Sequence, residues 1–176
     1  MKDDLLVKCV EDIYEHYART AVKNFNQDGQ CFPQLHALWC DPGQGEITNI
    51  VVIDSRLVIK FFEDSTMKQA MMLFVDGMLT LPPPTRVDED RPADFVVQIS
   101  EAWAVTRQSK AAADAVTAPS KCADRREVII ISVHSKNRTF SGACPIHDAP
   151  TRHAEYNGMM TTTGGGMVRQ RETETH

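Results

Sequence analysis

Apolar and polar residues alternate along this chain with two different periods. From residue 4 to residue 25 the apolar positions recur every three or four residues, which predicts an amphipathic helix. The polar segment 26–29 ends in glycine and predicts the end of that helix. Residues 34–41 and 46–54 are apolar or β-branched and flank a Pro-Gly turn, so they predict a β-hairpin.

The second half of the chain also contains segments with helical spacing and segments with strand-like spacing of apolar residues. Residues 56–62 fit either a strand or a helix. After them, Asp64 or Ser65 is a candidate helix N-cap, and apolar positions at helical spacing continue as far as Leu79. Three methionines, Met67, Met71 and Met78, belong to this stripe, and we interpret them as core packing because flexible thioethers fill gaps well. Residues 94–106 predict a long strand, residues 126–135 a central strand with two apolar faces, and residues 138–146 its hairpin partner.

These elements predict an α+β fold. In the predicted arrangement, a mostly antiparallel sheet of about five strands carries two main helices on one face, as a two-layer sandwich. We assign residues 1–156 to a single domain and expect residues 157–176 to form a flexible tail, since large apolar residues other than Met are scarce there. The proline-rich segment 81–94 and the long connection 107–126 are interpreted as loops within that domain.

Composition narrows the classes of function. Apolar residues make up 42% of the 176, enough for a core, and the net charge of -5 argues against nonspecific binding to nucleic acid. The chain has no apolar run long enough to span a membrane and no apolar leader, which predicts a cytoplasmic protein with no membrane partner. Five cysteines without CxxC spacing argue against a disulfide framework. The chain has no phosphate-binding glycine loop, so we expect no cofactor.

The first candidate site is a cluster of charged residues. Glu101 interrupts the apolar face of its predicted strand, between Ile99 and Trp103. Either a β-bulge turns the side chain outward, or the carboxylate lies among apolar neighbours and needs a partner. If the strands at 94–106 and 126–135 pair antiparallel, Arg125 or Arg126 at the start of the second strand can reach it. We prefer a structural clamp for the long loop. The alternative is a polar pocket in which Glu101 is a general base and Arg125 binds an anionic substrate.

Histidines and cysteines supply two further candidates. Ser132, His134 and Glu101 form a nucleophile-base-acid set on paper, although no GxSxG turn accompanies them. The candidate metal ligands have a single CxxH spacing, whereas zinc sites usually present paired short spacings. These candidates are Cys144, His147 and His153, with Cys122 as a fourth ligand. We therefore expect no metal.

One region resembles a family of uncharacterised proteins from bacteria and their phages, whose pattern is a Ser-Glu-Ala-Trp strand followed by Pro-Ser and Asp-Arg-x-Glu-Val. The matching residues are Ser100, Glu101, Ala102 and Trp103, then Pro119, Ser120, Asp124, Arg125, Glu127 and Val128. In that family His-Pro often precedes Asp-Arg, where this chain has Cys122-Ala123. The resemblance covers residues 94–146 and implies a microbial or phage accessory protein, without implying an activity.

The leading functional hypothesis is a non-catalytic protein that acts by binding another protein, with a homodimer as one form of that binding. An unpaired strand at the edge of the sheet is the feature expected to bind the partner. The alternative hypothesis is a small hydrolase or transferase that uses Glu101 and Arg125, with His134 nearby. The two differ in whether Glu101 lines an open pocket with Arg125 and His134 or is sealed by an arginine.

Overall fold

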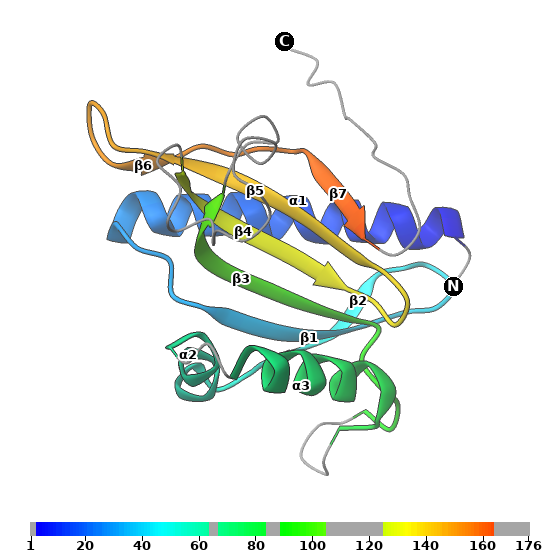
Figure 1. The fold of residues 1–176 in the computed structure, drawn as a ribbon. Coiled ribbons are helices and arrows are strands. Elements are labelled where there is room, and N and C mark those ends of the chain that lie inside the picture. Colours follow the sequence, from blue (N-terminus) through cyan, green and yellow to red (C-terminus); the bar gives the residue numbers. More distant parts are fainter. Residues whose placement is uncertain (1–2, 64–66, 84–88, 105–124, 164–176) are drawn as a thin grey trace.

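The chain folds into one curled antiparallel sheet with helices on both of its faces (Figure 1). The computed structural model describes residues 3–63, 67–83, 89–104 and 125–163, and these contain three helices and seven strands. The helices are α1 (Asp3–Asp28), α2 (Ser55–Glu63) and α3 (Lys68–Thr80). The strands are β1 (Gln34–Cys40), β2 (Ile47–Val52), β3 (Phe95–Ala104), β4 (Arg126–His134), β5 (Thr139–His147), β6 (His153–Ala154) and β7 (Met160–Thr163). The α+β class is confirmed.

The strand order is β2-β1-β3-β4-β5-β6, and β7 pairs with the other end of β5. Every pairing is antiparallel, so the predicted hairpins β1–β2 and β4–β5 and the central place of β4 are confirmed. About five strands were expected, and the described residues form seven. The two that were missed, β6 and β7, have two and four residues, too few for a pattern of alternation.

Helix α1 buries its predicted apolar stripe against one face of the sheet. Val10, Ala18 and Phe25 are completely buried there, together with apolar residues from β1, β3, β4 and β5. Gly29 ends the helix in a left-handed conformation, with φ of 75°, and its N–H donates to the carbonyl of Phe25. The predicted stop at residues 26–29 is therefore confirmed.

The two faces of the sheet are covered by different helices, which corrects the two-layer arrangement with both helices on one face. In β3, Phe95 and Val97 pack against α1, whereas Val96 between them packs against α2 and α3. Successive side chains of a strand point to opposite faces, and a strand that is apolar on both needs cover on both. The sheet is therefore the middle layer where β1 and β3 lie between α1 and the α2–α3 pair (Figure 1).

Residues 56–62, which fitted either element, belong to helix α2. Asp54 sets its start, because the Asp54 carbonyl accepts from the N–H of Val58 and its carboxylate accepts from the N–H of Arg56. Met71, Val75 and other apolar residues of α3 pack with α2 in a second core. The interpretation of the methionine stripe as core packing is confirmed. The proposed helix caps at Asp64 and Ser65 lie outside the described residues.

The boundary of the predicted tail needs correction. Residues 160–163 form β7, paired with β5, and Asn157 accepts a hydrogen bond from the Tyr14 hydroxyl of α1 through its carbonyl, at 2.8 Å. Little in the sequence indicates this strand, since Thr-rich segments also occur in loops. Residues 164–176 and the connection 105–124 lie outside the described residues. In the part of the chain that the structure describes, no helix has the length and apolar character needed to cross a membrane.

Candidate functional site

Glu101 is held at the edge of the α1 core by an arginine other than the ones predicted. One carboxylate oxygen accepts from the N–H of Cys31, and the other lies 3.6 Å from the Nη2 of Arg152, in the β5–β6 turn. The same Nη2 lies 2.9 Å from Glu127. Arg152 also donates to the carbonyl of Gly29. The carboxylate thus joins β3 to the segment after α1, as a clamp does.

Arg125 contacts the ring of Trp103. Its guanidinium carbon lies 4.5 Å from the centre of the Trp103 ring, a cation–π contact on the same side of the sheet. The predicted guanidinium for Glu101, from Arg125 or Arg126, is therefore replaced by Arg152, which follows β5 in the chain. Register explains why the carboxylate is where it was expected: Glu101 lies opposite Ile129 and follows Ile99 on the α1 face.

Ser132, His134 and Glu101 do not come together as a nucleophile-base-acid set. Ser132 and His134 lie opposite Gln98 and Val96 in the β3–β4 register, and Val96 packs on the α2–α3 side of the sheet. Glu101 points to the α1 side, so the sheet itself separates the carboxylate from the histidine. Glu101 and His134 therefore do not line one pocket, and the enzyme hypothesis loses the support that a shared pocket would have given it.

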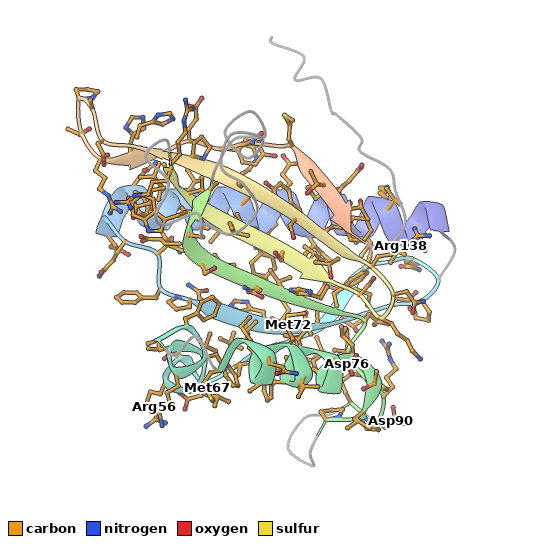
Figure 2. All side chains as sticks on the ribbon, in the orientation of Figure 1. Arg56, Met67, Met72, Asp76, Asp90 and Arg138 are labelled. Atoms are coloured by element: carbon orange, nitrogen blue, oxygen red, sulfur yellow. The ribbon has the colours of Figure 1, made fainter. Side chains whose placement is uncertain are left out.

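His134 instead closes the bottom of a shallow groove between α3 and the β4–β5 turn. The groove encloses about 220 Å³ and is lined by Met72 and Asp76 of α3 and by Arg138 of the turn, among others (Figure 2). The His134 Nδ1 is 3.1 Å from the Thr139 hydroxyl, and burial lowers the pKa of the ring. Its neighbour Ser132 shares a hydrogen bond of 2.8 Å with Ser141. These contacts are local to one hairpin.

The candidate metal ligands lie on different sides of the sheet. Cys144 is completely buried on the α1 face, whereas His147 and His153 stack on the other face with ring centres 5.2 Å apart. His147 Nε2 lies 3.2 Å from a carboxylate oxygen of Glu155. Within the described residues, no three candidate ligands come together, and Cys122 lies outside them.

A second hollow, larger than the groove beside His134, lies between α1, β1 and β2. It has a volume of about 340 Å³ and was not predicted. Its floor is formed by Tyr17 and His36, and its rim by Phe32, Ile50 and Val52. The complete lining is His16, Tyr17, Thr20, Ala21, Asn24, Asp28, Gln30, Cys31, Phe32, Gln34, His36, Ile50, Val52 and Ile99. We call this hollow the α1–β2 pocket.

The polar floor of the α1–β2 pocket is built from two side chains. The Tyr17 hydroxyl lies 2.9 Å from His36 Nδ1, and their rings meet edge to face. Burial raises the pKa of Tyr17 to about 12 and lowers the pKa of His36, so at neutral pH both are uncharged. When Tyr17 donates to Nδ1, the His36 proton is on Nε2, which has no hydrogen-bond partner within the described residues.

The rim of the pocket is apolar and open to solvent. Phe32, Ile50 and Val52 are 56%, 49% and 64% exposed, and exposed apolar side chains that gather at a hollow are typical of binding sites. Ile50 and Val52 lie opposite Leu38 and His36 in the β1–β2 register, so they project to the side of the sheet that α1 covers elsewhere. Beside them, α1 leaves that face uncovered.

The outer edge of β2 is unpaired within the described sheet. The Ile53 N–H donates to the Leu35 carbonyl, and in an antiparallel ladder such inward bonds occur at every second residue. The intervening residues, Ile50 and Val52, therefore direct their backbone N–H and carbonyl groups away from β1. Residues Ile47–Val52 include no charge and no proline, the usual protections of an edge strand.

Sequence reasoning missed the pocket because its walls come from three separate segments. The signal available in the sequence was the second strand of the hairpin, which has no charged residue on either face. The sequence does not show, however, that this strand lies at the edge of the sheet. Searches of protein-family models, of curated proteins and of solved structures find no match to this chain. The geometry of the pocket and of β2 is therefore the basis for a functional proposal, and the resemblance to phage and bacterial proteins stays a prediction.

Proposed function

We propose that this protein binds an extended segment of a partner protein, which pairs with the outer edge of β2 and inserts one large apolar side chain into the α1–β2 pocket. The observation that carries this proposal is that Ile50 and Val52 contribute to both features. Their backbone groups point to the open edge, and their side chains form the rim of the pocket. In strand addition, main-chain hydrogen bonds supply affinity and an adjacent side-chain pocket supplies specificity.

The chemistry of the pocket indicates the kind of segment. Its rim is apolar, its floor is the neutral Tyr17–His36 pair, and its lining contains the carboxylate of Asp28 but no lysine or arginine. An acidic segment would meet the Asp28 carboxylate and a chain of net charge -5. We therefore expect a neutral or basic segment with an aromatic, leucine or methionine anchor, whose polar atoms, if any, accept from His36.

A second copy of the chain is a less suitable occupant. Two β2 strands could pair edge to edge, but the side chains that each would offer on this face are Ile50 and Val52. Both are short and branched at Cβ, and both already form the rim of their own pocket. A hollow of about 340 Å³ needs a longer side chain to fill it. An extended segment of a partner protein can both pair with the edge of β2 and insert a long side chain into the pocket.

Peptide selection followed by N-methyl scanning tests the proposal. Peptides selected from a random library against the whole protein are resynthesised with single N-methyl groups, and affinity is measured by fluorescence anisotropy. Because a strand directs alternate N–H groups to its neighbour, methylation should weaken binding at least about tenfold at every second amide and change it little at the others. A flat response along the peptide would contradict strand addition.

Two protein variants locate the binding site. Val52→Lys places a charge on the rim and should weaken the selected peptide at least about tenfold, because the ammonium group would be desolvated. Leu73→Lys is the matched control, since Leu73 of α3 is equally exposed, at 67%, but lies away from β2. Equal effects of the two substitutions would overturn the location, and a concentration-dependent dimer without peptide would favour pairing between copies.

A further inference from the structure

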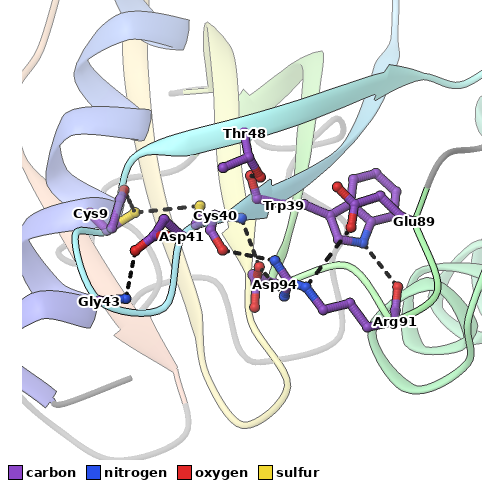
Figure 3. Close-up of polar contacts among 10 residues, drawn as sticks. Cys9, Trp39, Cys40, Asp41, Gly43, Thr48, Glu89, Arg91 and Asp94 are labelled. Atoms are coloured by element: carbon purple, nitrogen blue, oxygen red, sulfur yellow. Dashed lines mark hydrogen bonds and ion pairs between the residues drawn. The ribbon is translucent and has the colours of Figure 1, made fainter.

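Two thiols from distant parts of the chain meet inside the molecule, away from the α1–β2 pocket. Cys9 of α1 and Cys40 of β1 have sulfur atoms 3.9 Å apart (Figure 3). Both are buried: Cys9 is 5% exposed and Cys40 is inaccessible. Both are reduced in this structure. Two thiol sulfurs this close on separate elements are near enough that a further approach brings them to the bonding distance of a disulfide.

The backbone beneath Cys40 is fixed by a charged pair. The Cys40 N–H donates to a carboxylate oxygen of Asp94 at 2.8 Å, and an Arg91 Nη2 donates to the Cys40 carbonyl at 2.8 Å. Arg91 and Asp94 are themselves joined at 2.7 Å (Figure 3). Cys9 is within α1, and its thiol lies 3.2 Å from the carbonyl of Gly45. The two sulfurs are therefore held as neighbours and do not meet by chance.

The environment makes the two thiols chemically unequal. The contact between the two thiols lowers the pKa of Cys9 and raises the pKa of Cys40. Cys9 is also the more accessible of the two. A thiolate is the form that reacts with oxidants, so Cys9 is the attacking sulfur and Cys40 the resolving one.

We infer that Cys9 and Cys40 are a site of reversible oxidation, in which a peroxide converts the pair into a disulfide that ties α1 to β1. The Cys9 thiolate attacks one oxygen of hydrogen peroxide, which breaks the O–O bond, gives a sulfenic acid and releases hydroxide. The Cys40 sulfur then attacks the Cys9 sulfur, and the sulfenic oxygen leaves as water with the Cys40 proton. The released hydroxide takes up the proton that Cys9 lost on forming its thiolate, so overall two thiols lose two electrons and two protons and peroxide is reduced to two waters. This inference does not depend on the proposed function.

The other described cysteines serve as internal references. Burial and the nearby Glu101 carboxylate raise the pKa of Cys31 to about 11, and burial raises the pKa of Cys144. Both changes disfavour the thiolate. Oxidation directed by the fold should therefore begin at Cys9, whereas oxidation of an unfolded chain should show no such preference.

Peptide mapping tests the inference on the unmodified protein. The folded chain is treated with hydrogen peroxide, its remaining thiols are alkylated, and the digest is analysed by mass spectrometry without reduction. We expect the Cys9–Cys40 linked pair, two hydrogens lighter, as the main oxidised product, lost after treatment with dithiothreitol. In urea, its share of the oxidised product should fall at least about threefold. Finding both cysteines unlinked in the folded protein, or the same mixture in urea, would overturn the inference.

A trapping experiment checks the order of the two steps. In Cys40→Ser the sulfenic acid on Cys9 has no resolving thiol, and its labelling by dimedone should rise at least about fivefold over the unsubstituted protein. Cys31→Ser is the control and should leave both the linked pair and the labelling unchanged. Labelling at Cys9 that does not rise in Cys40→Ser would contradict the assigned roles. The thermal midpoint provides an independent reading, since the cross-link should raise it by about 5–10 °C.

Discussion

The two flanks of helix α1 are treated differently by the rest of the chain. On the flank toward β5 and β6, the side chain of Asn26 bonds both the N–H and the carbonyl of Ala154, and Tyr14 donates to Asn157. Arg152 adds a bond to the carbonyl of Gly29. On the flank toward β2, the helix leaves a hollow of about 340 Å³ with an exposed apolar rim. One flank is sealed and the other is open.

The two flanks differ in the groups that they leave available to a partner protein. The sealed flank uses side chains that bond backbone groups, and those groups are then not available to a partner. The open flank exposes apolar side chains and directs unpaired backbone groups to solvent, at some risk of aggregation. Retaining such an edge is a cost to a protein that has no partner for it. The strongest tests of this comparison alter one flank at a time.

The largest expected effect is at Gly142, on the sealed flank. A Cβ at this position would lie 2.1 Å from the Tyr14 hydroxyl oxygen, and Tyr14 is buried and hydrogen-bonded to Asn157. Gly142→Ala should therefore lower the free energy of unfolding by about 2–3 kcal/mol, measured by urea denaturation. The control is Gly77→Ala in α3, where a Cβ meets nothing within 4 Å and should stabilise the helix by about 0.5–1 kcal/mol. The same change in both variants would contradict the packing described.

A smaller loss is expected from Arg152→Gln, which opens the clamp on the sealed flank. The substitution removes the ion pair at 2.9 Å with Glu127, the longer contact with Glu101 and the cation–π contact with Phe25. The Arg152 side chain is 37% exposed, so solvent screening reduces the expected loss to about 1 kcal/mol. Arg56→Gln, at an exposed pair with Asp54, should change stability less. If the two variants lose the same stability, the clamp is no more than an ordinary surface pair.

The smallest effect on stability is expected on the open flank. Val52 is 64% exposed at the rim, so Val52→Lys should change the free energy of unfolding by no more than about 0.5 kcal/mol. Circular dichroism during urea denaturation measures this directly. Because the same substitution is expected to weaken peptide binding at least about tenfold, stability and binding should separate here. A loss of stability like that of Gly142→Ala would show that the rim belongs to the core.

Much of this fold follows from local patterns. The stripe of α1, the β1–β2 hairpin and the central place of β4 each depend on residues close together in the sequence, where periodicity is informative. The inward direction of Glu101 was predictable for the same reason, since strand alternation places it with Ile99. The placement of α2 and α3 was missed although Val96 and Val97 are both apolar and require cover on both faces.

The sites depend on contacts that no local pattern encodes. Arg152 reaches Glu101 because β5 turns back through β6, and two-residue β6 leaves no sequence pattern. The α1–β2 pocket combines side chains from α1, the segment before β1, and β2, each ordinary by itself. Cys9 and Cys40 become neighbours only when α1 packs on β1. Residues 34–41 and 46–54 predicted a hairpin, but only the sheet order shows that β2 is the open edge.

The most direct test of the open edge is amide hydrogen exchange by NMR, with and without a selected peptide. In the free protein, the outward amides of Ile50 and Val52 should exchange at least about tenfold faster than the inward amides of Val51 and Ile53. Bound peptide should slow Ile50 and Val52 at least about tenfold, because their N–H groups then have partners. Protection at Ile50 and Val52 that is already high without peptide, or that peptide leaves unchanged, would contradict strand addition at β2.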